Sequence, residues 1–389
     1  MKAIKIIKYF LAYVFIGLAM GSYLPILSSY LKNDLHFSGS EVGSITAIMI
    51  LISIITLPLW GFLTDHIKSP KKTLIISLLF SALLIGCVAF IKTYAFFLVM
   101  ISIFMIFRAP IFGLYDEILI EVCKREKINY GTMRIGGSLG YATSLLIGSI
   151  FTRLYGNGVL FILSAIFFFM VATLIILSED VKYHHKEVIN IKVDVPILLK
   201  NKVFFIAIVV YSLTFGVMDS NMTFMSTYLN VFSQGDKWIS IAVFLSSFIE
   251  LPILYSTKYV YRKFNLKQIY LFLNTISIIR YLLLFMFPTT ATVLILAPLH
   301  GITFGLGYPI MIQFIKEKVR GNVLATAYTI FNALLALTTA IFNYLSGYLL
   351  DLFTEQIHYL FILYLVISIL NLIYTIFRLK FDSYKAIMV

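Results

Sequence analysis

Residues 158–178 read GVLFILSAIFFFMVATLIILS, a stretch without a charged side chain. As an α-helix rising about 1.5 Å per residue, it is long enough to cross the roughly 30 Å hydrocarbon core of a bilayer. Comparable runs recur at approximately 9–31, 42–63, 73–91, 94–119, 132–152, 158–178, 203–231, 238–260, 268–287, 291–315, 323–350 and 357–377. A β-barrel would show short alternating segments, so these continuous runs predict an all-α membrane protein with twelve transmembrane helices.

The composition leads to the same class of protein. Of the 389 residues, 60% are hydrophobic and only 13% are charged, whereas soluble domains carry about 25% charged residues. The first apolar run follows Lys2, Lys5 and Lys8 as in a signal peptide, but it continues to Tyr30 without a small-residue cleavage site. We therefore expect it to be retained as the first helix.

The distribution of basic residues explains the net charge of +13. If the first helix starts inside, the inner segments hold 24 of the 31 Lys and Arg residues and the outer loops hold four. This asymmetry predicts a multi-pass protein of the cell membrane with both termini in the cytoplasm. The basic segments then favour the anionic lipids of the bilayer as partners and exclude a nucleic-acid-binding role.

The longest polar stretch divides the chain into two halves of six predicted helices. We predict an N-terminal bundle over 1–178, a cytoplasmic linker over 179–202 and a C-terminal bundle over 203–389. No further ligand stands near His184 and His185 at a spacing that suits a metal site, which favours a solvated linker over a metal site. Two related six-helix halves are typical of one large class of secondary transporters.

Ionisable residues within the apolar stretches are the strongest indication of function. A charge at mid-bilayer costs several kcal/mol, about 2.5–3.5 on insertion scales, so such residues usually face a cavity or a partner and mark a transport path. Nine of them occur here: Arg108, Asp116, Glu117, Glu121, Arg134, Asp219, Glu250, Arg280 and, when protonated, His300. They favour a carrier over a simple membrane anchor.

Small residues at intervals of four predict close helix packing. Gly136, Gly140, Ser144 and Gly148 fall on one face of the predicted fifth helix. Gly17/Gly21 in the first helix and Gly301/Gly305 in the tenth repeat the pattern. Such faces allow two backbones to approach closely, and we favour this packing role over direct contact with a solute.

The end of the second predicted helix carries a motif of a known family. Gly61 is followed four residues later by Asp65, and then by a basic turn with Lys71 and Lys72. This pattern resembles the loop 2–3 motif of the major facilitator superfamily, although the usual glycine after the aspartate is replaced around Lys68-Ser69-Pro70. The resemblance implies the major facilitator fold of two six-helix bundles and a gating role for Gly61, Asp65, Lys71 and Lys72.

A closer resemblance covers nearly the whole chain. The segment 117–141 is similar to helices four and five of the lactose permease and phenylpropionate permease group. That resemblance implies that Glu117, Arg134 and Tyr141, with the adjacent Asp116, bind the solute. In the second half, Glu250, Arg280 and His300 match the proton-coupling network of the permease, and Asp219 falls near an aspartate of that network.

Some positions depart from the permease pattern. Thr303 stands where the permease carries its proton-binding glutamate, Ala297 replaces a lysine, and the eleventh helix has no lysine to pair with Asp219. The identity of the solute cannot be carried over from the family, and facilitated uniport stays open beside proton symport. From the chemistry alone, a buried carboxylate near an arginine can change its protonation when a solute competes for that arginine.

Three classes of function follow from these features. The leading hypothesis is a monomeric secondary active transporter of a sugar, nucleoside or aromatic acid, working by alternating access and driven by a proton gradient without a bound cofactor. The alternative is a proton-driven exporter of amphipathic drugs or lipids, which the aromatic content of 16% would suit. The third is a membrane enzyme or receptor with metal bound at Asp116, Glu117 and Glu121. We expect the protein not to be an enzyme. The sequence contains no ATP-binding loop motif, so it does not encode direct use of ATP.

Overall fold

A computed structural model describes residues 2–179, 198, 202–231, 235–319, 323–353 and 356–378. In this part of the chain, twelve helical segments are long and apolar enough to cross a membrane, as predicted. The chain forms two compact units, one of residues Met1–Lys186 with Gly235–Ser240 (unit 1) and one of Glu187–Gln234 with Ile241–Val389 (unit 2). The predicted linker, including His184 and His185, lies almost entirely outside the described residues, so its boundaries stay a prediction.

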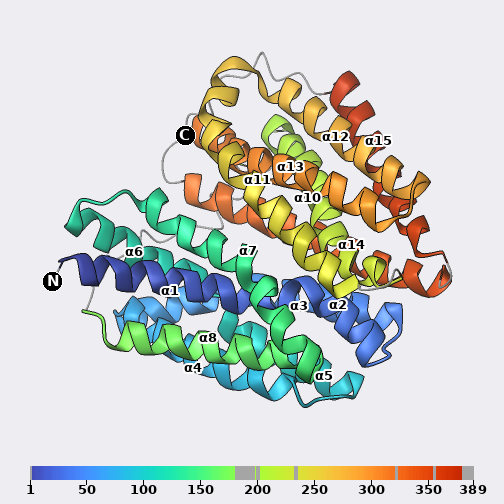
Figure 1. The fold of residues 1–389 in the computed structure, drawn as a ribbon. Helices are drawn as coiled ribbons and strands as arrows, with labels where there is room; N and C mark the ends of the chain where they lie inside the picture. The colour runs from blue at the N-terminus through green and yellow to red at the C-terminus, as the bar shows by residue number, and fades with distance from the viewer. Residues whose placement is uncertain are drawn as a thin grey trace. The chain divides into compact units, whose positions relative to one another are not determined.

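Unit 1 begins with one long, irregular span (Figure 1). It consists of α1 (Lys2–Tyr23), a 3-10 turn (Leu24–Ile26), α2 (Leu27–Ser29) and a π-helical turn (Tyr30–Asp34). Pro25 falls in the 3-10 turn, where the missing N–H of proline interrupts the α-helical hydrogen bonding. The remaining helices of unit 1 are α3 (Gly39–Ile67), α4 (Pro70–Val88), α5 (Tyr94–Arg108), α6 (Ile111–Glu126), α7 (Tyr130–Tyr155) and α8 (Val159–Ile176).

Unit 2 contains the other six spans, except for Gly235–Ser240 at the start of α11, which is grouped with unit 1. Five of them are continuous helices, and the last begins after a short 3-10 turn. Their bounds are α10 (Lys202–Leu229), α11 (Gly235–Lys263), α12 (Leu266–Met286), α13 (Thr290–Lys318), α14 (Val323–Leu352), the 3-10 turn Ile357–Tyr359 and α15 (Leu360–Arg378). α11 and α13 contain Pro252, Pro298 and Pro309 within their helical spans, which membrane helices tolerate when neighbours satisfy the freed carbonyls.

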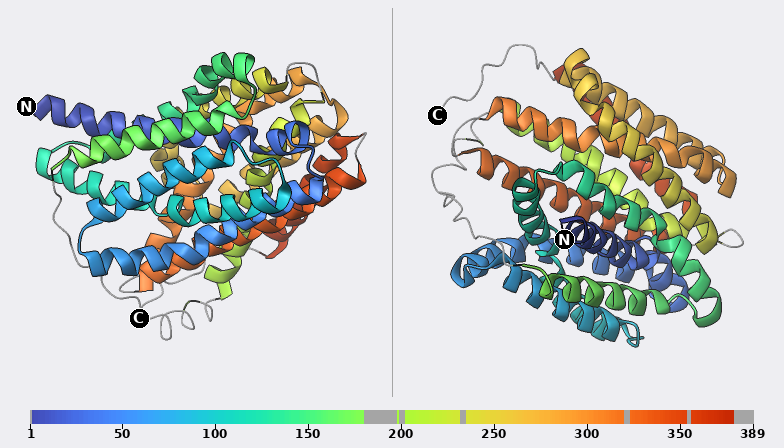
Figure 2. Two further views of the ribbon diagram at one scale, coloured as in Figure 1. Left: turned by 90° about the horizontal axis from the view of Figure 1, so that it is seen from below. Right: turned by 60° about the vertical axis from the view of Figure 1, so that its left-hand side comes forward.

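The two units repeat the same packing scheme. In unit 1, α1 packs against α7 and α8, and α4 packs against α8 and α5 (Figure 1; Figure 2, right). In unit 2, α10 packs against α14 and α15, and α12 packs against α15 and α13. In both units, therefore, the first span contacts the fifth and sixth, and the third contacts the sixth and fourth. This shared scheme is an internal structural repeat of the kind found in secondary transporters.

The fourth span differs from its predicted form. The apolar run 94–119 predicts one continuous helix, but the structure has α5 ending at Arg108 and α6 starting at Ile111, with α6 continuing to Glu126. Pro110 lies at the junction and cannot donate a backbone hydrogen bond, which accounts for the break. The break separates Arg108 from the acidic residues of α6.

Close approach between helices occurs where the small residues predict it. A Cβ atom built on Gly17 or Gly140 would fall well inside 3.0 Å of a backbone carbonyl oxygen, that of Gly137 or Val14, so α1 and α7 meet backbone to backbone. In unit 2, a Cβ on Gly301 would meet the Ser246 carbonyl oxygen of α11 in the same way. The prediction of tight packing at these glycines is confirmed.

The turn between α3 and α4 uses a residue other than glycine in a left-handed conformation. Lys68 ends α3 with a φ of 54°, and its N–H donates to the Thr64 carbonyl oxygen. Glycine is favoured at such a position because a Cβ atom there is strained. Ser69 then caps α4, accepting a hydrogen bond from the Lys72 N–H, and Pro70 occupies the first turn of that helix.

Candidate functional sites in the two units

In unit 1, a polar cluster joins three helices around Asp116. The Tyr13 hydroxyl of α1 donates to Asp116 Oδ1 of α6 at 2.7 Å. Tyr130 of α7 forms a side-chain hydrogen bond with the same carboxylate. Arg134, one helical turn after Tyr130, acts electrostatically on both tyrosines. We call these four residues the Asp116 cluster.

The chemistry of the Asp116 cluster suits a polar solute. A carboxylate offers only acceptors when ionised, an arginine offers only donors, and a tyrosine hydroxyl can serve as either. Arg134 is exposed within the unit and Asp116 is half-buried, so both are accessible from outside their helices. Together they present the donors and acceptors that bind hydroxyl groups or an amide.

The other predicted binding residues of unit 1 lie close by on the same helices. Glu117, a predicted binding residue, is half-buried on α6, and so is Glu121, which the metal alternative names. Tyr141 lies on α7 at the close contact with α1, where its backbone N–H is near Gly17. Across the described residues, no group of three or more His, Cys, Asp or Glu side chains could hold a metal ion. The arrangement therefore gives no support to a metal site at Asp116, Glu117 and Glu121.

Arg108 has partners of an unusual kind. Its Nε lies 3.1 Å from the Met20 sulfur of α1, and a terminal nitrogen lies 3.9 Å from the Met105 sulfur. Among the described residues no carboxylate pairs with it, and its remaining interaction is electrostatic, with Tyr23. Thioether sulfurs are weak acceptors, so this arginine keeps most of its hydrogen-bonding capacity.

In unit 2, the structure brings together two of the four predicted coupling residues. A terminal nitrogen of Arg280 in α12 lies 3.0 Å from His300 Nδ1 in α13, and both side chains are buried. The His300 ring stacks on Phe304, with 5.9 Å between ring centres. Because a guanidinium can only donate, His300 must accept at Nδ1, which makes it the neutral tautomer with hydrogen on Nε2.

The other two predicted coupling residues are placed differently. Asp219 is half-buried on α10, and its carboxylate has no hydrogen-bond or ionic partner among the residues that the structure describes. Glu250 lies in α11 where Gly305 of α13 makes a close approach. Thr303 donates its hydroxyl to the Leu299 and His300 carbonyl oxygens, so it is engaged with its own helix.

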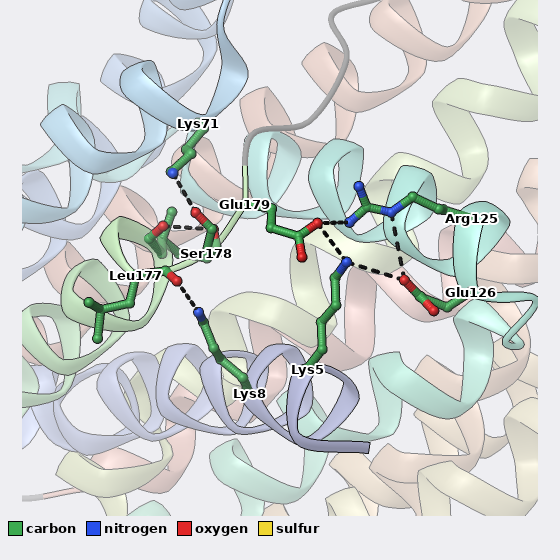
Figure 3. Close-up of polar contacts among 9 residues, drawn as sticks. Lys5, Lys8, Lys71, Arg125, Glu126, Leu177, Ser178 and Glu179 are labelled. Carbon is green, nitrogen blue, oxygen red and sulfur yellow. Dashed lines mark hydrogen bonds and ion pairs between the residues drawn. The ribbon is translucent and has the colours of Figure 1, made fainter. Parts of the chain in front are cut away.

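A third cluster surrounds the C-terminal end of α8 (Figure 3). Lys8 of α1 donates to the Leu177 carbonyl oxygen, and Lys71 of α4 donates to the Ser178 carbonyl oxygen at 2.6 Å. Helix C-termini leave carbonyl groups unpaired and carry partial negative charge, so basic side chains are favoured there. Lys71, a predicted gating residue, therefore caps α8 in this structure.

Glu179 completes this cluster just after α8. Its Oε2 lies 2.7 Å from Lys5 Nζ and 2.8 Å from a terminal nitrogen of Arg125. Lys5 also reaches Glu126 at 3.2 Å, which ties α1, α6 and the segment after α8 together. We call Lys5, Lys8, Lys71, Arg125, Glu126 and Glu179 the α8 clasp. Of the other predicted gating residues, Gly61 and Lys72 are exposed within unit 1 and Asp65 is half-buried.

The α8 clasp should depend on pH through Glu179. The hydrogen bond from Lys5, with the charges of Lys5 and Arg125, holds the pKa of Glu179 below its ordinary value of 4.5. A lowered folded-state pKa gives stability that is present above the unfolded-state value and lost as the pH falls through the folded-state value. We expect Glu179→Gln to lower the melting temperature slightly at pH 7. The difference from the wild type should shrink as the pH falls below 4.5 and vanish once Glu179 is protonated in the folded protein. A difference that does not shrink in thermal scans at acidic pH would contradict the role of this carboxylate.

Residues 5–376 match the MFS_1 like family. The chain belongs to this family. It is 27% identical over 376 residues to the uncharacterized transporter YwbF of Bacillus subtilis, covering 96% of this chain and 93% of that protein. It is 24% identical over 352 residues to a maltose permease of Geobacillus stearothermophilus, covering 90% and 89% of the two chains.

Solved structures share the fold. The nucleoside transporter NupG superposes with a TM-score of 0.86 at 16% identity, covering 96% of this chain and 99% of that one. A bacterial homologue of the lysosomal transporter Spinster superposes with a TM-score of 0.72 at 10% identity, covering 96% and 94%. The predicted family and the all-α major facilitator fold are thus confirmed, and the protein is a multi-pass membrane transporter.

Tyr13 and Tyr130 are the residues that the sequence analysis missed. Each is one of 25 tyrosines in the chain, and the contact of Tyr13 with Asp116 joins positions 103 apart. The place of Tyr130 in the site could have been predicted, because Tyr130 precedes Arg134 by four residues and so lies on the same face of the helix. No comparable spacing pointed to Tyr13.

Proposed function

We propose that the protein is a secondary active symporter that moves a small organic solute, namely a sugar, a nucleoside or an aromatic acid, together with a proton. The Asp116 cluster carries this proposal, because it places one carboxylate, one arginine and two hydroxyl groups from three helices within one site. Relatives named as a maltose permease and a nucleoside transporter support solutes of this size and polarity. Glu117 and Tyr141 on the same helices complete the proposed binding residues of unit 1.

The proton-coupling part of the proposal rests on unit 2. A carboxylate in a region of low dielectric can become neutral by taking up a proton, and Asp219 has no other means of neutralisation among the described residues. Thr303 cannot replace the family's glutamate as a proton carrier, because a hydroxyl does not ionise in this range. Asp219 is therefore the proposed carrier, with Glu250, Arg280 and His300 as the groups that complete the coupling network.

The proposal also covers the membrane, the topology and the driving force of transport. The excess of Lys and Arg in alternate loops supports a cell-membrane protein with both termini in the cytoplasm. The proton gradient across that membrane would then drive uptake without a bound cofactor. Gly61, Asp65, Lys71 and Lys72 are the proposed gating residues, and the protein is proposed to act as a monomer.

Uptake by reconstituted protein tests this function. Purified protein in proteoliposomes is expected to accumulate a labelled solute from a panel of sugars, nucleosides and aromatic acids when an inward proton gradient is imposed. An ionophore that collapses the gradient should abolish the accumulation. Equal uptake with and without the gradient would favour facilitated uniport, and drug resistance conferred on a pump-deleted host would favour the exporter alternative.

The Asp219→Asn variant isolates the coupling step. Asparagine keeps the size of the side chain but cannot bind and release a proton, so we expect accumulation against a gradient to fall to the background level. Exchange of labelled for unlabelled solute at equilibrium needs no net proton movement and should be retained. Loss of both activities in a variant that binds the solute normally would contradict a role confined to coupling.

A further inference from the structure

Arg280 is a deeply buried cation that the protein itself leaves incompletely satisfied. Its side chain is 3% exposed, and its hydrogen-bond partner in the structure is the neutral His300 ring. Its Nε is buried with no acceptor among the described residues. The neighbouring Tyr281 hydroxyl is likewise buried, and no partner for it occurs in the described part of the chain.

An arginine in this position has no way to become neutral by itself. A guanidinium stays protonated in proteins, whereas a carboxylate such as Asp219 can take up a proton. An isolated buried charge is strongly unfavourable unless it is paired and hydrogen-bonded. No carboxylate of the described residues forms an ion pair with Arg280. The Tyr281 ring, whose centre lies 5.9 Å from the guanidinium carbon, offers a cation–π contact but no full negative charge. The described residues therefore leave the counter-charge of Arg280 to a bound molecule.

The net charge of Arg280 and His300 together indicates which charge the bound molecule carries. His300 accepts from Arg280 and is therefore neutral, which leaves the pair with a single positive charge. One singly charged anion with two oxygen acceptors balances it, and a carboxylate matches the donor fork of arginine. We infer that the transported solute is an acid whose carboxylate binds Arg280, rather than a neutral sugar or nucleoside.

This inference rests on the proposed symport, and it makes the transport of solute and proton electrically neutral. A monocarboxylate that enters with one proton adds no net charge to the cell. The solute would supply the negative charge for Arg280, and Asp219 would hold the proton. The two groups then have distinct roles: Arg280 recognises the anion, and Asp219 carries the proton.

Binding to matched solute pairs tests the inference. The purified protein, in chloride-free buffer, is titrated with glucuronate and glucose, and with 3-phenylpropionate and its amide, by calorimetry and by thermal shift. The wild type should bind an acid at least about tenfold more tightly than its neutral partner, the smallest effect expected for a hydrogen bond to a charged group. Arg280→Gln should remove this preference, Arg280→Lys should keep part of it, and Arg262→Gln, at an exposed position of α11, should leave it unchanged.

A second measurement applies whichever acid is the natural solute. If Arg280 is an unbalanced charge held for a ligand, Arg280→Gln should raise the melting temperature of the ligand-free protein. A lower melting temperature would mean that the protein itself satisfies Arg280, and it would overturn the inference. Equal binding of acids and neutral partners would overturn it too, as would full stabilisation by chloride alone at matched ionic strength.

The results also separate this inference from the proposed function. If the protein takes up a neutral solute with protons, and Arg280→Gln does not affect this uptake, then the inference of an acid solute is wrong and the proposed symport is retained. Acid binding that requires Arg280, without any uptake driven by a pH gradient, would support the anion site and count against symport.

Discussion

Replacing Arg134 with alanine is expected to reduce solute uptake by about ten- to a hundredfold at low solute concentration. Arg134 is the cationic donor of the Asp116 cluster, and a hydrogen bond to a charged group contributes about 1.5–3 kcal/mol. Because the guanidinium is exposed within unit 1, its removal should leave the helix packing intact. Initial rates in proteoliposomes over a range of solute concentrations would measure the loss.

Two control variants make this result specific. Arg134→Lys keeps the charge but loses the planar fork of donors, so it should recover only part of the activity. Arg262→Ala removes an exposed basic residue from α11 and should transport normally. Full uptake by Arg134→Ala would remove this residue, and with it the Asp116 cluster, from the proposed binding site.

The sequence predicts the helices of this protein better than their interruptions. A spanning helix must satisfy its own backbone hydrogen bonds in lipid, so each of the twelve spans required its own long apolar run. A break within a span does not change the hydropathy of the sequence. The hydropathy of the run 94–119 therefore gave no sign of the junction between two helices at Pro110. The proline itself was the only local indication of that junction.

The candidate sites were predictable where the chain offered a charge, and much less so elsewhere. Charges stand out against an apolar background, so Asp116, Arg134, Arg280 and His300 could be found from the sequence. Their partners could not, because tyrosines such as Tyr13 are common in apolar helices and their contacts depend on how the helices pack. The neutral state of His300 likewise follows from its distance to Arg280, which no spacing in the sequence could give.

The contact between α1 and α7 gives the second large prediction. Gly140→Ala would place a methyl group well inside 3.0 Å of the Val14 carbonyl oxygen and 2.9 Å from the Leu18 nitrogen, both backbone atoms of α1. Backbone cannot rotate out of the way as a side chain can, so the two helices must separate. We expect a loss of about 1–3 kcal/mol of stability, the usual range for overpacking, and a clear fall in melting temperature.

The matched control for this prediction lies in α6. A Cβ built on Gly113 meets no heavy atom within 4 Å among the described residues. Alanine there should be neutral or slightly stabilising, because it restricts the unfolded chain and favours the helix.

Gly17→Ala, which would meet the Gly137 carbonyl oxygen from the opposite helix, should reproduce the loss seen with Gly140→Ala. The spacing of α1 and α7 also sets the position of Tyr13 on α1 relative to Tyr130 and Arg134 on α7, so the glycine variants should lose uptake along with stability. A Gly140→Ala protein as stable and active as Gly113→Ala would show that α1 and α7 do not need this backbone contact.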